Sequence, residues 1–298
     1  MRCVIFDDMD SRGRRGGGDS RRAPVDPDLG LFGPDSVSWR VHSEPILALA
    51  GLRALYLQAL HPRAIAGVAQ NSNYRDDPFG RLERTGIYVA TVVFGTTAQA
   101  EDAGRRLRRL HAKLRATDPR TGTEFRIDDP ELLRWVHVTE VESFVTTACR
   151  AGLDLSDAEV DRYYDEQRRA AALVGLDPET VPGSAAAVAD YYRSVRSDLV
   201  LTADSLRAAR FLSAPPLPFG LGITPVRLAW FGVAAIAVGL LPRWARRIYG
   251  LPGVPTTDPV ASLSARALRL SLRALPERVL RGPIYHAAME RAATTLPA

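Results

Sequence analysis

The sequence predicts an all-α fold. From Leu29 onward, apolar residues recur mostly every three to four positions, which is the spacing of helices that bury one face. Residues that cap helix ends stand at the start of several of these runs. The alternation typical of half-buried strands is nearly absent, apart from a doubtful stretch around Tyr88 to Phe94. We expect one large helical domain over residues 29–298.

The first 28 residues differ in composition from the rest of the chain. They contain a glycine run (Gly16 to Gly18), six arginines and six aspartates, with almost no apolar periodicity. Such a segment cannot bury enough apolar surface to offset the entropy lost on ordering. Residues 1–28 are therefore predicted to be a disordered tail.

Two helices are predicted in the first half of the domain by their capping residues. Thr96 followed by Gln99 has the spacing of a capping box, which predicts a helix over about 97 to 115. Asp129 and Pro130 are a typical N-cap and first helical residue, so a second helix should begin there.

The following helices are bounded in a similar way. The second helix should stop at Gly152, and Ser156 with Glu159 begins a third that ends at Gly175. A fourth helical stretch is expected from Pro182 to the apolar, proline-rich segment at 215–218.

The charge-free run over residues 228–242 has two interpretations. It is shorter than the roughly 18 to 20 residues that a membrane-spanning helix needs, which favours a buried core helix. Aromatic and basic residues within and after it instead favour a helix in a membrane interface, with peripheral contact through residues 228–249. These residues are Trp230, Arg243, Trp244, Arg246 and Arg247.

Composition and charge exclude several classes of protein. The formal net charge is +5, but the basic residues are spread out and no recognition motif accompanies them, so no nucleic-acid partner is expected. Cys3 and Cys149 are the only cysteines, which excludes a disulfide framework and a cysteine zinc cluster. The first residues carry acids where a signal peptide needs an apolar run, so a cytoplasmic location is expected.

Two histidines are predicted to point into apolar surroundings. His111 falls on a stripe formed by Ala100, Ala103, Leu107, Leu110 and Leu114. In the next helix, His137 is aligned with Leu133, Val141, Phe144 and Ala148, and Glu140 follows one turn later. Such a histidine is either hydrogen-bonded in the core or a ligand to a buried group. A metal ion held by His111, His137 and Glu140 is a further alternative.

The segment at 73–88 concentrates polar side chains. Arg81 and Thr85 are four residues apart, which on a helix places them on one face. This segment is either a charged turn that leads into a helix or the polar rim of a cofactor pocket, where arginine can pair with a carboxylate. His61, before Pro62, is expected to cap the C-terminus of a helix.

Eight segments, in the same order from about residue 30 to the end, resemble the family of MpaB-type oxygenases and rubber oxygenases (latex-clearing proteins). The segments are LFGPDSVSWRV, LYLQALHPRAIAGVAQNS, DPFGRLERT, VVFG, RLHAKL, FRIDDPELLRWVHVTEVES, LPRWARRIYGLP and LPERVLRGPIYHAAMER. The resemblance implies a single helical domain with a buried pocket for one haem b.

The resemblance also implies roles for individual residues. The family's proximal haem ligand is the histidine in the helix after an R-x-x-x-T segment, and it matches His111 here. The arginine and threonine of that segment match Arg81 and Thr85, which would line the haem pocket. The W-V-H motif of the next helix matches Trp135 to His137, so His137 would also lie beside the cofactor.

Two departures from the family pattern concern the reaction itself. Arg84 stands where latex-clearing proteins have a lysine near the distal iron position, and an always-protonated guanidinium is not expected to bind iron. Those proteins also have a glutamate, proposed as a base, upstream of that position. This chain has no glutamate between Glu44 and Glu83. The haem scaffold is thus expected to be shared, while the substrate and the proton chemistry differ.

The function implied by the resemblance is that of a haem-dependent oxygenase. Its partners would be O2 and an apolar small molecule such as an isoprenoid or another alkene. The alternative from another class is a non-catalytic haem- or lipid-binding helical protein, in which the pocket persists without turnover.

Overall fold

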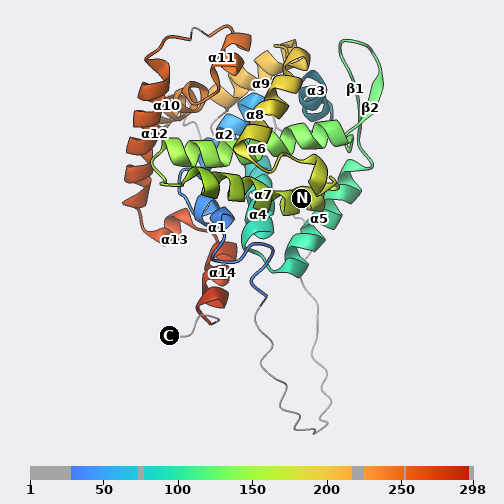
Figure 1. Cartoon of the computed structure of the whole chain (residues 1–298). Coiled ribbons are helices and arrows are strands. Elements are labelled where there is room, and N and C mark those ends of the chain that lie inside the picture. The colour runs from blue at the N-terminus through green and yellow to red at the C-terminus, as the bar shows by residue number, and fades with distance from the viewer. Residues whose placement is uncertain (1–27, 73–76, 217–224, 252, 295–298) are drawn as a thin grey trace, which may run out of the picture.

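Almost every element of the structure is a helix, which confirms the predicted all-α class (Figure 1). The computed structural model describes residues 28–72, 77–216, 225–251 and 253–294, so the predicted disordered tail lies outside the described residues except for Asp28. The helices are Val37–His42 (α1), Leu47–Gln58 (α2), Pro62–Asn71 (α3), Pro78–Phe94 (α4), Thr97–His111 (α5), Pro130–Arg150 (α6), Asp157–Val174 (α7), Ala185–Ser194 (α8), Ala203–Ser213 (α9), Pro225–Gly239 (α10), Arg243–Ile248 (α11), Thr257–Arg273 (α12), Glu277–Leu280 (α13) and Pro283–Ala293 (α14). The described part also contains two 3-10 turns, Pro178–Thr180 (η1) and Arg196–Asp198 (η2), and an antiparallel pair of strands, Arg115–Thr117 (β1) and Glu124–Arg126 (β2).

Capping boxes begin α5 and α7 as the sequence predicts. The backbone N–H of Gln99 donates to the Thr96 hydroxyl at 3.2 Å, and the Thr96 N–H donates back to the Gln99 side chain at 2.9 Å. Ser156 and Glu159 form the same reciprocal pair at the start of α7. That helix ends at Gly175, whose φ of 98° lies in the left-handed region that glycine adopts without strain.

Two boundaries near the centre of the chain differ from the prediction. Helix α5 ends at His111 and not near residue 115, because the chain turns there and Arg115 already pairs with Arg126 in the β-hairpin. Residues 88–94 are the end of α4 and not a strand. Val93 in this stretch is buried, so tertiary packing outweighs the strand preference of its β-branched residues.

The hairpin β1–β2 was not expected, since each strand has only three residues and too little alternation to read. It leads directly into α6, where Asp129 is the N-cap that the sequence predicts. The Asp129 carboxylate accepts from the backbone N–H of Glu131 at 2.9 Å, and Pro130 occupies the first helical position.

His61 begins a helix and does not end one, which corrects the predicted role. Its Nδ1 accepts from the backbone N–H of Ala64 at 3.3 Å, so it is the N-cap of α3. Burial, together with the charge of Arg63, lowers the pKa of His61. The lowered pKa favours the neutral ring, which is the form that can accept this hydrogen bond.

The helical stretch expected after Pro182 is divided into α8, η2 and α9. New N-caps cause the division: Ser184 accepts from Ala187 at the start of α8, and Thr202 forms a capping box with Ser205 at the start of α9. Of the proline-rich segment that should end this stretch, residues 217 and 218 lie outside the described part.

Helices α2 and α6 form the central pair of the fold. α6 crosses the middle of the molecule, and its buried residues Trp135, Val138 and Val145 pack in one cluster with Leu49 and Tyr56 of α2 (Figure 1). Helices α1 and α7 also contact α6, and α10 packs on α2 and α12. The largest hydrophobic cluster therefore lies between α2, α6 and the C-terminal helices.

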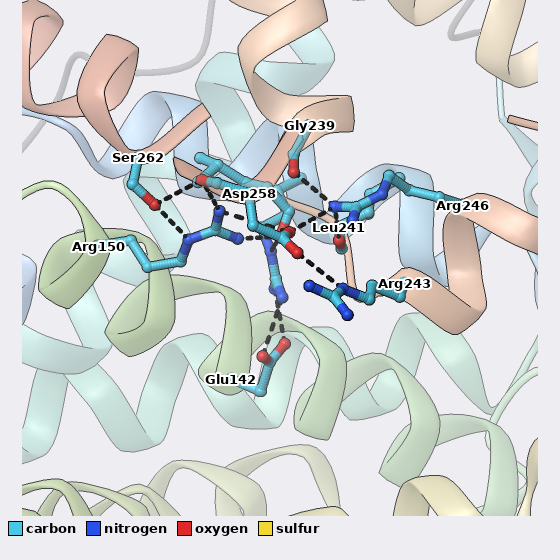
Figure 2. A network of polar contacts seen from close by, with 10 residues as sticks. Glu142, Arg150, Gly239, Leu241, Arg243, Arg246, Asp258 and Ser262 are labelled. Atoms are coloured by element: carbon cyan, nitrogen blue, oxygen red, sulfur yellow. Dashed lines mark hydrogen bonds and ion pairs between the residues drawn. The ribbon is translucent and has the colours of Figure 1, made fainter. Parts of the chain in front are cut away.

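A buried ion pair joins the two central helices. Arg53 of α2 donates to both carboxylate oxygens of Glu142 of α6, at 2.6 and 2.9 Å, and Arg53 is 1% exposed. The Tyr192 hydroxyl donates to the same carboxylate at 3.1 Å. Figure 2 shows Glu142 at one end of a polar network that continues to α10, α11 and α12. These extra hydrogen bonds offset the cost of burying the two charges.

Three arginines from three helices bind the carbonyl groups at the C-terminal end of α10 (Figure 2). Arg53 and Arg150 both donate to the Leu240 carbonyl, at 3.0 and 3.1 Å. Arg246 donates to the carbonyls of Gly239 and Leu241, each at 2.7 Å. Because the last carbonyls of a helix lack partners and carry partial negative charge, this arrangement fixes the end of α10 to α2, α6 and α11.

The segment at 228–249, which the sequence allows to be core or interfacial, is mixed in the structure. Its later part is packed inside: Ala234, Ala237, Leu240 and Leu241 are buried, and so is Arg246. Leu228, at its start, is 74% exposed. Within the described residues, no helix is both long and apolar enough to cross a bilayer.

Candidate cofactor pocket

Four consecutive helices, α4 to α7, carry the residues that the sequence selects as candidates. α4 and α5 are antiparallel and joined at Gly95 and Thr96, so the first half of α4 lies at the same end as the last half of α5. α5 packs closely on α7 at Gly104, where an added Cβ would stand 2.8 Å from the Leu173 carbonyl oxygen. α6 and α7 pack on each other and close the group.

One face of α4 carries Arg81, Thr85 and Tyr88. Their spacings of four and three residues place them one above the other on the helix. The Thr85 hydroxyl donates to the Arg81 carbonyl at 3.1 Å, as expected for residues one turn apart. Arg84 is occupied elsewhere, because it forms an exposed ion pair with Asp77, the N-cap of α4, at 3.1 Å.

The first half of α4 is exposed to solvent on several sides in the described part of the chain. Six consecutive residues, 82–87, are all exposed, including Leu82 at 46% and Ile87 at 51%. A helix packed on one side would bury every third or fourth of these residues. The α4 segment that carries Arg81, Arg84 and Thr85 is thus open on several sides.

His111 is the last residue of α5 and is half-buried. Its Nδ1 is buried without a hydrogen-bond partner among the described residues. Burial lowers the pKa of His111, and the charge of Asp128 opposes this shift, so an acidic group that is distant in sequence lies near the ring. The predicted stripe around it is only partly correct: Ala100 is buried, whereas Leu110 is 53% exposed.

His137 of α6 is enclosed more tightly than His111. Burial lowers its pKa to about 4, while a hydrogen bond to the backbone of Gln167 on α7 opposes the shift. Its Nε2 is buried and has no partner among the described atoms. His137 also borders a cavity of about 10 Å³, lined by residues that include Val141 and Tyr164, which is far too small for a porphyrin.

Glu140 of α6 has a carboxyl group whose pKa is strongly shifted by the surrounding protein. Part of its side chain can be reached by solvent, yet the surrounding protein raises its pKa to about 7. Its charge contributes to the raised pKa values of Tyr88 on α4 and Tyr163 on α7, after burial, which is the main cause for both. Glu140 therefore lies between α4 and α7. Within the described residues Nε2 of His137 has no hydrogen-bond partner, so it is not paired with Glu140.

Three buried polar atoms without partners come from three neighbouring helices. They are the Tyr88 hydroxyl on α4, Nδ1 of His111 on α5 and Nε2 of His137 on α6. Leaving such a group unsatisfied costs about 1 to 3 kcal/mol, so each of the three is a candidate to contact a bound group. Other such atoms, including His42 Nδ1 and Arg246 Nε, lie outside α4 to α7. Tyr88 ends the polar segment at 73–88 that the sequence singles out, but no individual role was predicted for it. Its spacing of seven residues from Arg81 and three from Thr85 places it on the same face of α4.

His111, His137 and Glu140 do not converge into a three-ligand metal site. Among the described residues, no group of three or more histidine, cysteine, aspartate or glutamate side chains is placed to hold a metal ion. This geometry disfavours the alternative of a two-histidine, one-carboxylate centre. A cofactor that needs one histidine from the protein is compatible with the same geometry.

The sequence matches one protein family over most of its length. Residues 39–274 match the family described as "ER-bound oxygenase mpaB/B'/Rubber oxygenase, catalytic domain". The matched range includes α4 to α7 and all of the candidate residues. No curated protein and no solved structure matches the chain.

Proposed function

Because the chain belongs to the mpaB and rubber oxygenase catalytic-domain family, we propose that it is an oxygenase that uses one haem b bound by His111. The proposed substrates are O2 and an apolar small molecule with a carbon–carbon double bond, such as an isoprenoid. The family match supports oxygenase activity in general. The haem and the substrate class rest on the residues of α4 to α6.

The observation that carries the proposal is the exposed first half of α4, together with buried polar atoms that have no partner among the described residues. Six exposed residues of α4 precede Tyr88, whose hydroxyl has no partner, and His111 lies at the same end of the α4–α5 pair. A planar cofactor beside this part of α4 would cover the exposed apolar residues and supply contacts for the polar groups. The donor set fits haem, which needs one imidazole ligand.

Each candidate residue has a chemical task in this proposal. His111 would hold the iron through its imidazole, which burial keeps neutral and able to donate a lone pair. Arg81 would pair with a propionate, and Thr85 would offer its hydroxyl at the pocket wall. Arg84 would place a fixed positive charge at the pocket rim. When bound, the haem supplies the redox chemistry that activates O2.

Apolar side chains beside these residues support an apolar substrate. Leu82 and Ile87 of α4, and Leu110 next to His111, are large and exposed. Covering apolar surface of this kind with an apolar ligand favours binding by about 25 cal/mol per Å² of buried area. The pocket wall therefore favours a hydrocarbon over a charged metabolite.

The experiment that tests the proposal is the visible spectrum and iron content of purified protein, expressed with haem supply. We expect a Soret band and one iron per chain. Colourless protein that takes up neither iron nor added hemin would contradict haem binding. O2 consumption with squalene, and incorporation of label from 18O2 into its products, then separates an oxygenase from a non-catalytic haem- or lipid-binding protein.

A further inference from the structure

Helix α12 has a buried face and an apolar outer face. Ala261, Ala265 and Arg269 point into the protein, and Arg269 forms a bidentate ion pair with Glu44 at 2.6 and 2.7 Å. The opposite face carries Val260, Leu263, Ala267, Leu270 and Ala274, which are all exposed. Figure 1 shows α12 along the edge of the molecule.

The outer face is apolar to an unusual degree for a helix in contact with water. Val260 is 60% exposed, Leu263 70% and Leu270 66%. The apolar surface continues after the helix, with Leu275 at 45% and Val279 at 67%. A continuous exposed patch of this kind marks an interaction surface.

The charge around this face is almost entirely positive. Residues 225–280 contain eight arginines and two acids, Asp258 and Glu277. Asp258 is already paired with Arg243 and Arg246, so it does not neutralise the helix face. Arg266 and Arg273 are exposed and flank the apolar stripe, and Arg273 also lies 3.8 Å from a carboxylate oxygen of Glu44, which Arg269 already pairs. An apolar stripe bordered by arginines is typical of helices that lie in the interface of an anionic membrane.

The same flanking residues disfavour a second copy of the chain as the occupant. The stripe has the three- and four-residue spacing of a coiled-coil seam, whose partner choice depends on complementary charges beside it. Here one flank carries Arg266 and Arg273, and the other carries Ser264 and Ser271. Antiparallel pairing of two such helices would bring arginines together, and parallel pairing would give them only serines.

We propose that the outer face of α12, with the α12–α13 connection, binds the surface of a bilayer that contains anionic phospholipids. The leucines and valines enter the acyl boundary, and Arg266 and Arg273 contact the lipid phosphates. This surface is formed by α12 and the residues that follow it, and it does not depend on haem binding. Membrane contact would place the protein beside a reservoir of apolar molecules.

The test is co-sedimentation of the full chain, as purified, with vesicles of phosphatidylcholine alone or with about one third phosphatidylglycerol. We expect binding to the anionic vesicles to exceed binding to the neutral ones by about tenfold, and to weaken at high salt. Leu263→Glu/Leu270→Glu should lower binding by about tenfold or more, because both leucines lose their place in the acyl boundary. Arg266→Gln/Arg273→Gln should remove most of the preference for anionic vesicles.

The control is Leu206→Glu on α9, another exposed leucine, at 37%, which lies outside this face. It should bind vesicles like the unaltered protein, and circular dichroism should show that all variants remain folded. The proposal is overturned if the unaltered protein stays in the supernatant with both vesicles, or if the Leu263/Leu270 variant still binds. A dimer by light scattering that this variant dissociates, without vesicle binding, would instead assign the face to a second copy.

Discussion

The carboxylate of Glu140 on α6 acts electrostatically on the hydroxyl of Tyr88 on α4. Burial, and then the charge of Glu140, raise the pKa of Tyr88 to about 12, and burial raises that of Glu140 to about 7. A carboxyl group that is protonated near neutral pH and a phenol that stays protonated both keep a proton available. Ionisation of Glu140 near neutral pH therefore changes the charge that acts on Tyr88.

Glu140→Gln should make the haem-free protein more stable at high pH. The folded pKa lies above the ordinary value of 4.5, so the folded state binds a proton that the unfolded state loses. The contribution of protonated Glu140 to the free energy of unfolding is fully present below about pH 4.5 and is lost as the pH rises through about 7. Between pH 5 and pH 8 the variant should gain roughly 2 to 3 kcal/mol over the unaltered protein in urea unfolding. An equal pH dependence for both proteins would contradict this. His137, whose pKa is lowered, makes stability depend on pH in the opposite direction. It is present in both proteins, so its effect cancels in the difference between their free energies of unfolding.

Tyr88→Phe should stabilise the haem-free protein while disturbing its haem-bound form. The hydroxyl is buried and unpaired in the described structure, so its removal spares a desolvation cost of about 1 kcal/mol. If haem or a bound ligand pairs with this hydroxyl, the same change should shift the Soret band or weaken hemin binding. Urea unfolding and hemin titration measure the two effects separately. A stability loss above about 1 kcal/mol in the haem-free protein would mean that the hydroxyl has a partner.

His111→Ala should abolish haem retention, whereas His137→Ala should keep the haem and alter mainly its spectrum or the stability of the fold. His111 lies at the open end of α4 and α5, while His137 borders only a cavity of about 10 Å³. Each change should lower the free energy of unfolding by about 1 to 3 kcal/mol, as core truncations do. Hemin titration of both variants, with circular dichroism to check folding, decides the point. A normal haem spectrum in folded His111→Ala, with loss in folded His137→Ala, would exchange the two roles.

Glu142→Ala should be among the most destabilising single changes in the protein. It leaves the guanidinium of Arg53 buried and without its carboxylate, which costs about 3 to 5 kcal/mol. The double variant Arg53→Met/Glu142→Leu removes both charges and should recover much of that loss, measured by urea unfolding. Arg105→Ala is the matched control, because its ion pairs with Glu101 and Asp102 are exposed and should contribute less than about 1 kcal/mol. A loss for Glu142→Ala as small as that of the control would refute the assignment.

Local chemistry explains which parts of the fold could be predicted from the sequence. The capping box of Thr96 and Gln99 and the N-cap Asp129 act within one turn, so their residues suffice to place α5 and α6. The end of α5 depends on pairing between Arg115 and Arg126, a contact across a turn that no local pattern reports. The role of His61 was misjudged because a histidine before proline can close one helix or begin the next.

The candidate site was predictable in its residue types but not in its surroundings. Arg81 and Thr85 are four residues apart, and helix geometry alone places two such residues on one face. The openness around them, and the contribution of Tyr88, depend on which helices pack on α4, and this is a property of the whole fold. Asp128 lies near His111 only because the β-hairpin returns the chain to the end of α5.

The hydrogen bonds that hold the C-terminal end of α10 also determine which helices can pack first while the chain is being synthesised. Arg150 donates to the Leu240 carbonyl across 90 residues of chain, and Arg53 reaches the same oxygen across 187. At a translation rate of about 5 to 20 residues per second, the ribosome takes roughly 5 to 18 s to add those 90 residues. During that time α2 and α6 can already pair through Arg53 and Glu142, while the groove that receives α10 stands open. The nascent chain is then exposed to aggregation and to chaperones until its C-terminal third emerges.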